Sequence, residues 1–278
     1  MLRRLEGRLQ GAHRTLHRGS GIDFAGLVEY AEGDDARHID WNVTARLDQP
    51  HVRVFTEDRD LTIWLVVDRS ASMAGGGPER TKSEAGTELA LVLARLFGRR
   101  GDRVAALLYD AGGMTIVPPG IGRRHVLRIR AALQPSTGAR GATTDLAAML
   151  DAASRAARRP ALVIVLSDFI GEGDWGRALL RLSRRHEVAA LRIVDRSDDQ
   201  LPEAGLLVVE DAETGEQLFV DSSDPLLRER FAAGVADREA LVTAATRRAG
   251  VPLHRIRTDR DPVASLVEVL GRPGRHRA

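Results

Sequence analysis

The sequence contains no cysteine, which excludes disulfide bonds, thiolate metal sites and cysteine nucleophiles. Any metal must therefore be held by oxygen chemistry. Lysine is almost absent too: Lys82 stands alone, so nearly all positive charge is arginine, and the formal net charge is only +2. The arginine clusters are interleaved with acids and lack neighbouring aromatics, so we expect no nucleic-acid partner.

Long hydrophobic runs are also missing. The first residues hold no apolar stretch of the length that a secretory signal needs, and no run of about 18 apolar residues follows. We therefore expect no membrane span and a cytoplasmic location. With 43% hydrophobic and 29% charged residues, the composition is that of a globular protein.

Short apolar runs alternate with amphipathic stretches of helical period from residue 61 onward. This pattern predicts an α/β fold with a mostly parallel sheet, doubly wound and Rossmann-like, with helices on both faces. Residues 114–117 follow the preceding run too closely for a crossover, so one edge is expected to be antiparallel. The four buried runs span residues 61–67, 104–109, 161–166 and 188–194.

Residues 206–210 and 217–220 predict a second hairpin, followed by a helix over 225–248, a strand over 253–257 and a helix over 262–270. Glycine-punctuated short segments before residue 61 predict a small β-containing N-terminal element. The predicted organisation is an N-terminal segment, residues 1–60, a main domain, residues 61–270, and a flexible tail, residues 271–278.

Three of the buried runs end in aspartate, at Asp68, Asp168 and Asp195, and ligands of open α/β sheets gather at the carboxyl ends of strands. We interpret Asp195, and Asp110 after the remaining run, as turn residues. Asp68 is followed by Ser70 and Ser72 at two-residue spacing. If this loop is extended, it can aim one carboxylate and two hydroxyls at one point, a ligand set that suits hard cations; a serine-rich turn that caps a helix is the alternative.

Two further segments join this pattern. Thr144 precedes an apolar-faced helix, where its hydroxyl would lie at the helix N-terminus beside Asp145. Asp168 follows Ser167 at the end of a buried strand, at the same sheet edge as Asp68. The alternative is that Thr144 only belongs to the cap of this helix and binds no ligand.

Together the Asp-x-Ser-x-Ser loop, the Thr-Asp-Leu helix start and the strand-borne Ser-Asp resemble the adhesion site of von Willebrand factor A domains. The resemblance implies a divalent cation, Mg²⁺ or else Mn²⁺ or Ca²⁺, among Asp68, Ser70, Ser72, Thr144 and Asp168. It also implies an open position for a carboxylate of a partner protein. The family usually has glycine where Thr143 stands, so the choice of Thr144 depends on the Asp-Leu that follows it.

The front of the chain is similar to the signature of the domain-of-unknown-function 58 (DUF58) proteins, in residues 20–24, 32–41 and 44–46. That resemblance implies a von Willebrand A-like domain acting with a MoxR-type AAA+ ATPase on a client protein. Many such proteins have membrane-spanning segments ahead of this signature, whereas residues 1–19 contain no apolar run that predicts one.

Three functions stay open. The first is a metal-dependent protein-binding module that is not an enzyme. The second is a Mg²⁺-dependent phosphohydrolase with Asp68 as nucleophile, although the second aspartate expected of dehalogenase-like phosphatases is Ser70 here. The third is a structural adaptor with an empty metal site. The sequence contains no Walker A, G-x-S-x-G or HExxH motif.

Overall fold

The computed structural model describes residues 23–31, 36–47, 49–56, 61–77, 79–110, 112–134, 145–171, 173–210 and 215–271. The chain divides into two compact units, with the division between Asp60 and Leu61. The tail predicted for residues 271–278 lies outside the described residues except for Gly271, which ends a helix.

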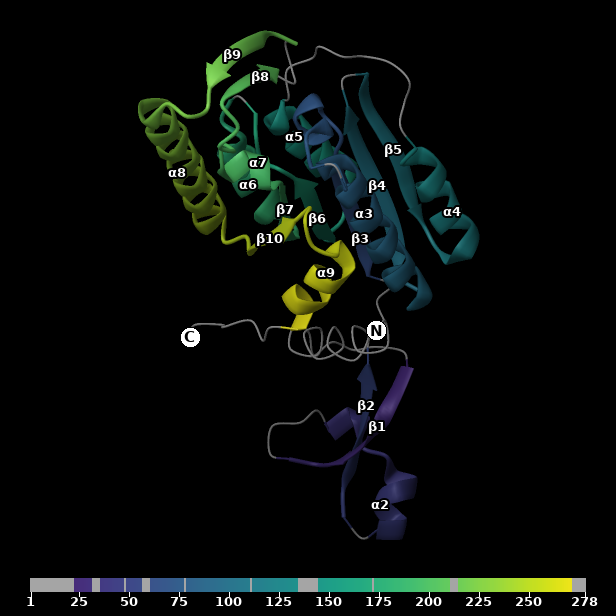
Figure 1. Cartoon of the computed structure of the whole chain (residues 1–278). Helices are drawn as coiled ribbons and strands as arrows, with labels where there is room; N and C mark the ends of the chain where they lie inside the picture. Colours follow the sequence, from purple (N-terminus) through teal and green to yellow (C-terminus); the bar gives the residue numbers. More distant parts are fainter. Residues whose placement is uncertain are drawn as a thin grey trace. The chain divides into compact units, whose positions relative to one another are not determined.

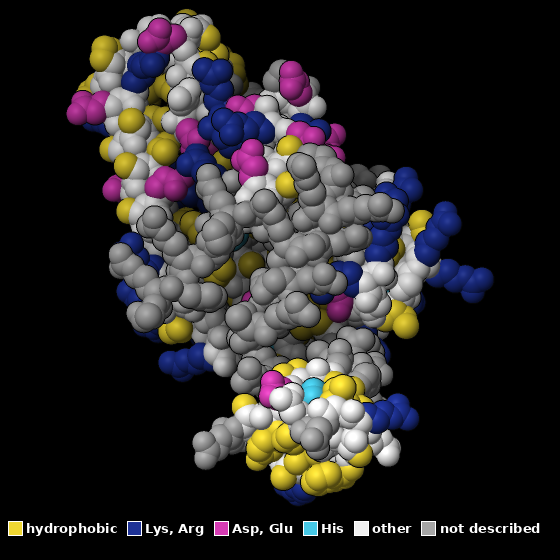
Figure 2. Space-filling view, turned by 90° about the horizontal axis from the view of Figure 1, so that it is seen from below, with side chains coloured by type: hydrophobic (Ala, Val, Ile, Leu, Met, Phe, Trp, Pro, Cys, Tyr) yellow, Lys and Arg dark blue, Asp and Glu magenta, His cyan; other side chains and the backbone are white. Residues whose placement is uncertain are grey.

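The smaller unit is built on one antiparallel strand pair. Strand β1 (Asp23–Glu29) pairs with β2 (His51–Thr56), and between them lie a 3₁₀ turn, η1 (Ala36–His38), and helix α2 (Trp41–Leu47). The Asp40 carboxylate begins α2 by accepting hydrogen bonds from the next turn's backbone N–H groups. Hydrophobic side chains gather on the surface of this unit (Figure 2), and Trp41 is 69% exposed.

The larger unit contains a six-stranded sheet with the order β10-β7-β6-β3-β4-β5. All neighbouring strands are parallel except β4 and β5, which form an antiparallel edge. The predicted fold class, α/β with a mostly parallel sheet and one antiparallel edge, is therefore confirmed. The strands are β3 (Thr62–Asp68), β4 (Arg103–Asp110), β5 (Gly113–Gly120), β6 (Leu162–Ser167), β7 (Glu187–Val194) and β10 (Leu253–Arg257).

Helices cover both faces of this sheet (Figure 1). Alternate residues of β3 enter different cores: Trp64 and Val66 pack with α5, α6 and α8, whereas Ile63 and Leu65 pack with α3, α4 and α9. Burial on both faces explains why the strand sequences are continuously apolar. The helices are α3 (Lys82–Arg99), α4 (Gly122–Ala132), α5 (Leu146–Ala156), α6 (Trp175–Ser183), α8 (Pro225–Ala249) and α9 (Pro262–Gly271).

The predicted second hairpin is present as β8 (Leu206–Glu210) and β9 (Gln217–Asp221), which form a separate two-stranded sheet. It is followed by α8, whose buried side chains all lie in its C-terminal part, at Val242, Thr246 and Ala249. The sequence did not predict α4 or the single-turn helix α7 (Arg196–Asp199). Of the helices within the described ranges, none has the length and apolar character that crossing a membrane requires.

Candidate functional site

Strands β3 and β6 bring two of the predicted acids to one edge of the sheet. The strands are parallel neighbours with Val67 opposite Leu166, so Asp68 and Asp168 both stand where the chain leaves the sheet. The chain order also reverses at β3, which has β4 on one side and β6 on the other. Such a switch point opens a crevice at the strands' carboxyl ends, where ligands of open α/β sheets bind.

The Asp68 carboxylate is completely buried and fixed at both oxygens. Oδ1 accepts a hydrogen bond of 2.9 Å from the backbone N–H of Ser70, and Oδ2 accepts one of 2.6 Å from the Ser167 hydroxyl. Ser167 is itself oriented by the N–H of Phe169, which donates to its Oγ at 2.9 Å. The loop after β3 and the end of β6 are thus joined through one carboxylate.

Ser70 and Ser72 lie together beside Asp68, with their Oγ atoms 3.1 Å apart. The expected extended loop is wrong in part, because residues Ala71–Ala74 form a 3₁₀ turn, η2, and the backbone is extended at the residues on either side of it, Ser70 and Gly75. The turn places the two hydroxyls next to each other despite its curvature. Ser70 is buried and Ser72 is half-buried, so the cluster reaches solvent on the Ser72 side.

Asp168 is also fully buried, and its main partner is Lys82. Lys82 Nζ lies 2.8 Å from Asp168 Oδ2 and 3.0 Å from Oδ1 of Asp198, which belongs to α7. The other Asp168 oxygen accepts from the N–H of Ile170 at 2.9 Å. Burial lowers the pKa of Lys82, but the two carboxylates outweigh it and the pKa is raised, so the group is an ammonium ion at neutral pH.

The backbone around Asp168 is held in an unusual conformation. Phe169 has φ of 56°, in the left-handed region that non-glycine residues seldom adopt, and its ring packs 5.4 Å from that of Trp175. The Asp168 carbonyl accepts a hydrogen bond of 3.1 Å from Arg192 Nε on β7. Such a conformation costs about 1–3 kcal/mol and persists only where its surroundings fix it, often at functional sites.

The electrostatics of this cluster favour a bound cation. Burial, then the neighbouring Asp168, raise the pKa of Asp68 to about 6, although hydrogen bonds from Ser167 and Ser70 oppose the rise. Asp68, Asp168 and Asp198 contribute three carboxylates against the one ammonium of Lys82, which leaves a net charge of minus two when all are ionised. A divalent cation would neutralise that charge.

The donor set fits such a cation in chemical type, since carboxylates and hydroxyls are the oxygen ligands that Mg²⁺ and Ca²⁺ prefer. Within the described residues, no group of three or more histidine, aspartate or glutamate side chains could hold a metal. Any cation here would therefore depend on the serine hydroxyls as well as on Asp68 and Asp168.

Thr144, the remaining predicted ligand, lies outside the described residues, as does Thr143. The residue that caps α5 is Asp145, whose side chain accepts from the N–H of Ala148 at 2.8 Å. The Asp145 N–H donates to the Tyr109 hydroxyl at 3.0 Å, so the start of α5 is attached to the end of β4.

Asp195 was predicted to be a turn residue, and the structure gives it further contacts. It does cap α7, but its buried Oδ2 also accepts hydrogen bonds from the Gly77 N–H at 3.0 Å and from the Thr258 hydroxyl. Burial raises the pKa of Asp195, but hydrogen bonds from Thr258, Ser197 and Gly77 outweigh it and hold the pKa at about 2. The loop after Ser72 is thereby attached to the ends of β7 and β10.

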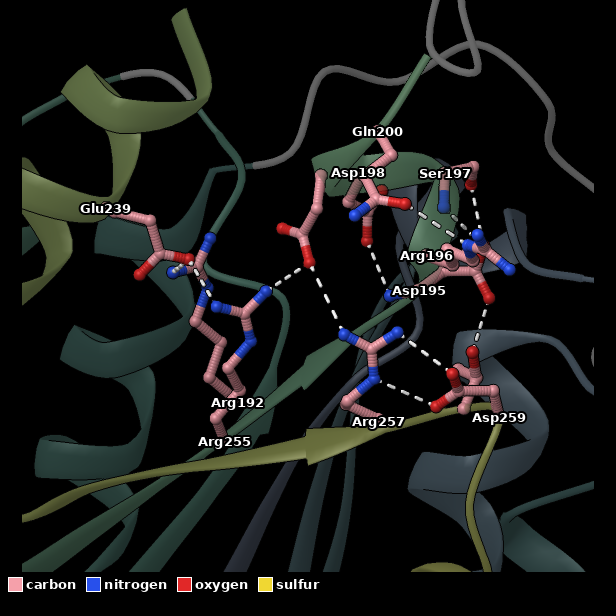
Figure 3. A network of polar contacts seen from close by, with 12 residues as sticks. Arg192, Asp195, Arg196, Ser197, Asp198, Gln200, Glu239, Arg255, Arg257 and Asp259 are labelled. Atoms are coloured by element: carbon pink, nitrogen blue, oxygen red, sulfur yellow. Dashed lines mark hydrogen bonds and ion pairs between the residues drawn. The ribbon is translucent and has the colours of Figure 1, made fainter. Parts of the chain in front are cut away.

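A network of arginines and acids continues from Asp195 across α7, β7, β10 and α8 (Figure 3). Asp199 of α7 contacts Arg255 and Arg257 of β10, and Glu239 of α8 lies 2.7 Å from Arg192 and 3.2 Å from Arg255. Helix α7 is only one turn long, so these ion pairs and the capping box at Asp195 fix its position.

The sequence interpretation did not include Lys82, Ser167, Asp198 and Asp195 in the site. One sequence feature could have pointed to Lys82: it is the only lysine of the chain, and it follows Thr81 in the first turn of a strongly patterned helix. The position of Ser167 directly before Asp168, at the strand end, could have pointed to Ser167.

Comparison with known proteins gives the following similarities. The family model described as "Protein of unknown function DUF58" matches residues 27–241. An uncharacterized protein of Mycobacterium bovis is 40% identical over 271 residues, which are 96% of this chain and 84% of that protein. An aerotolerance-related membrane protein from Bacteroides fragilis is 17% identical with a TM-score of 0.46, covering 76% of this chain and 96% of its own. The SpRpn10 VWA domain is 12% identical with a TM-score of 0.41, covering 76% and 95%.

Proposed function

The chain belongs to the DUF58 family, and we propose that the sheet edge at Asp68 and Asp168 holds a divalent cation through which it binds a carboxylate of a partner protein. The observation that carries the proposal is that two neighbouring strands end in fully buried carboxylates, one of which lies beside two adjacent serine hydroxyls, with Ser72 half-buried. Asp68, Ser70, Ser72 and Asp168 would hold the cation, together with Thr144. The cation would be Mg²⁺, or else Mn²⁺ or Ca²⁺, and would supply the positive charge that a carboxylate needs.

The chain is accordingly a cytoplasmic binding module rather than an enzyme, and its partner is a MoxR-type AAA+ ATPase that acts with it on a client protein. This part of the proposal comes from the resemblance of the segments within residues 20–46 to DUF58 proteins and of the Asp68 motif to the adhesion site of von Willebrand factor A domains. The client would supply the carboxylate. The ATPase would use the free energy of ATP hydrolysis to load or release that client.

A capture experiment tests this proposal. The immobilised chain is offered a purified MoxR-type ATPase with its client, once with Mg²⁺ and once with EDTA, and the Ser72→Ala variant is treated in the same way. We expect capture of the client to fall at least tenfold on removal of Mg²⁺ or of the Ser72 hydroxyl. Ser223→Ala, which removes an exposed serine of the turn before α8, is the matched control. Equal capture under all conditions would contradict a metal-dependent function.

The phosphohydrolase alternative is less well supported by the geometry. A nucleophilic aspartate must be open to the approach of a phosphoryl group, whereas the Asp68 side chain has no exposed surface. A bare cation is much smaller and needs only a lone pair that the two hydrogen bonds to Asp68 leave free. Turnover of p-nitrophenyl phosphate in the presence of Mg²⁺, lost in Asp68→Asn, would restore this alternative. The adaptor with an empty site has one observation in its favour, which is the ammonium of Lys82 on Asp168.

A further inference from the structure

Lys82 is a second, built-in cation at the candidate metal site. Its ammonium lies 2.8 Å from Asp168 and 3.0 Å from Asp198, and its side chain is 3% exposed. The ion pairs of a surface lysine are weak because water competes for its ammonium. A buried ammonium has lost its hydration and depends on its protein partners. The only lysine of the chain thus neutralises part of the charge that would attract a divalent cation.

The fold fixes this position. Lys82 opens α3 directly after Thr81, whose hydroxyl and backbone form a capping box with Glu84. The Lys82 N–H donates to the carbonyl of Gly75 at 2.9 Å, which closes the loop that begins with the serines. The same loop therefore carries Ser70 and Ser72 at one end and the ammonium at the other.

We propose that Lys82 competes with the divalent cation for Asp168 and thereby sets the affinity of the site for that cation. The inference depends on the proposed function, since it concerns the regulation of the same site. Asp198 makes the competition possible: when a divalent cation occupies Asp168, Lys82 keeps a carboxylate partner on α7, so no buried ammonium is left unpaired. The ammonium that leaves Asp168 is then paired with Asp198 of helix α7 alone.

The test is the affinity of the full chain for Mg²⁺ and Mn²⁺, measured by calorimetry for the wild type and for Lys82→Met. Methionine keeps much of the side chain's length without its charge. We expect binding to tighten about tenfold or more, because repulsion between two such close cations amounts to that much even when screened as in water. Arg80→Met is the matched control, since it removes a half-buried arginine of the same loop that pairs with Glu88, and we expect it to change affinity less than about twofold.

A second measurement needs no variant. Because Lys82 is the only lysine, a chain labelled with ¹⁵N-lysine at Nζ gives a single ammonium signal in its NMR spectrum. We expect Mg²⁺ to shift this signal with the same apparent affinity as in calorimetry, since Lys82 exchanges one partner for the other. This readout remains available if Lys82→Met does not fold.

The outcomes separate the two proposals. Tighter binding by Lys82→Met supports the inference, as does binding by that variant alone. If the wild type binds Mg²⁺ but Lys82→Met binds no more tightly, or the ammonium signal does not respond, Lys82 only positions Asp168 and the inference is wrong. If neither the wild type nor Lys82→Met binds Mg²⁺ or Mn²⁺, the proposed metal-dependent function fails, and the inference with it.

Discussion

Each acid of the candidate site has its carboxylate fixed before any ligand arrives. Asp68 is held from its own loop and from β6, and Asp168 is held by Lys82 and by the backbone of Ile170. Carboxylates that are already held in place lose little conformational entropy when a cation binds, so the site is preorganised. The arrangement also explains why two acids can remain buried close together, since each has its own partners.

Gly76 of this loop has no room for a side chain. A Cβ built there would lie 2.6 Å from the Thr81 Cα and 2.7 Å from the Arg80 carbonyl, both of them backbone atoms. We expect Gly76→Ala to lower the free energy of unfolding by about 2 kcal/mol, because the loop must move to admit the methyl group. Urea unfolding measures this. Gly234→Ala in α8 is the control: nothing lies within 4 Å of its Cβ, so it should be neutral or slightly stabilising. Equal effects of the two changes would show that the close approach at Gly76 is not tight.

Asp195 makes the stability of the larger unit depend on pH. Its folded-state pKa of about 2 lies below the ordinary value of 3.8, so its contribution is present above pH 3.8 and is lost as the pH falls towards 2. We expect Asp195→Asn to cost about 2 kcal/mol near pH 6, and the difference from the wild type to shrink between pH 4 and pH 2. Urea unfolding across this range measures it. A difference that stays constant down to pH 2 would contradict the assigned hydrogen bonds.

Residue types and spacing predicted that Asp68 and Asp168 stand at one edge of the sheet, with Ser70 and Ser72 after Asp68, because these residues follow strands that are recognisable from their apolar runs. Their role as metal ligands stays a prediction. The partners of those residues were not predictable in the same way. Lys82 and Asp168 are 86 residues apart in sequence, and Gly77 and Asp195 are 118 apart. Such contacts depend on the conformations of the loops at the end of the sheet, which no local sequence pattern predicts.

The regular elements followed from the sequence because their signals are local. Strand β10 has the predicted bounds, and α8 differs by one residue from its predicted C-terminal end. Helix α4 was missed because its exposed residues are mostly arginine and only Ile129 is buried, so its apolar stripe is weak. Helix α7 is a single turn, held by capping and by ion pairs rather than by an apolar face.

Asp198 of helix α7 is the second carboxylate partner of Lys82. If Asp198 draws Lys82 away from Asp168, Asp198→Asn leaves Lys82 to Asp168 alone and should weaken Mg²⁺ binding several-fold in the wild type. In a Lys82→Met background the same change should weaken binding less, because no ammonium is left to be shared and only the charge of Asp198 itself is lost. A double-mutant cycle by calorimetry measures this coupling. Equal losses in both backgrounds would mean that Asp198 acts only through its own charge.

At the scale of the whole molecule, the match to the DUF58 family spans residues of both units, whereas the residues of the candidate site belong to the larger unit alone. The smaller unit displays exposed hydrophobic side chains, among them Trp41 and Val28. The strand order of the larger unit explains why its site lies where it does, since β3 and β6 are parallel neighbours and therefore carry their two acids to the same edge of the sheet.

The central claim is that this edge binds a divalent cation through carboxylates and serine hydroxyls together. Calorimetric titration of the full chain with Mg²⁺, beside a variant that combines Ser70→Ala and Ser72→Ala, tests it most directly. We expect one binding site per chain in the wild type and no measurable binding in the variant. Binding that is unchanged in the variant, or absent from both the wild type and Lys82→Met, would contradict it.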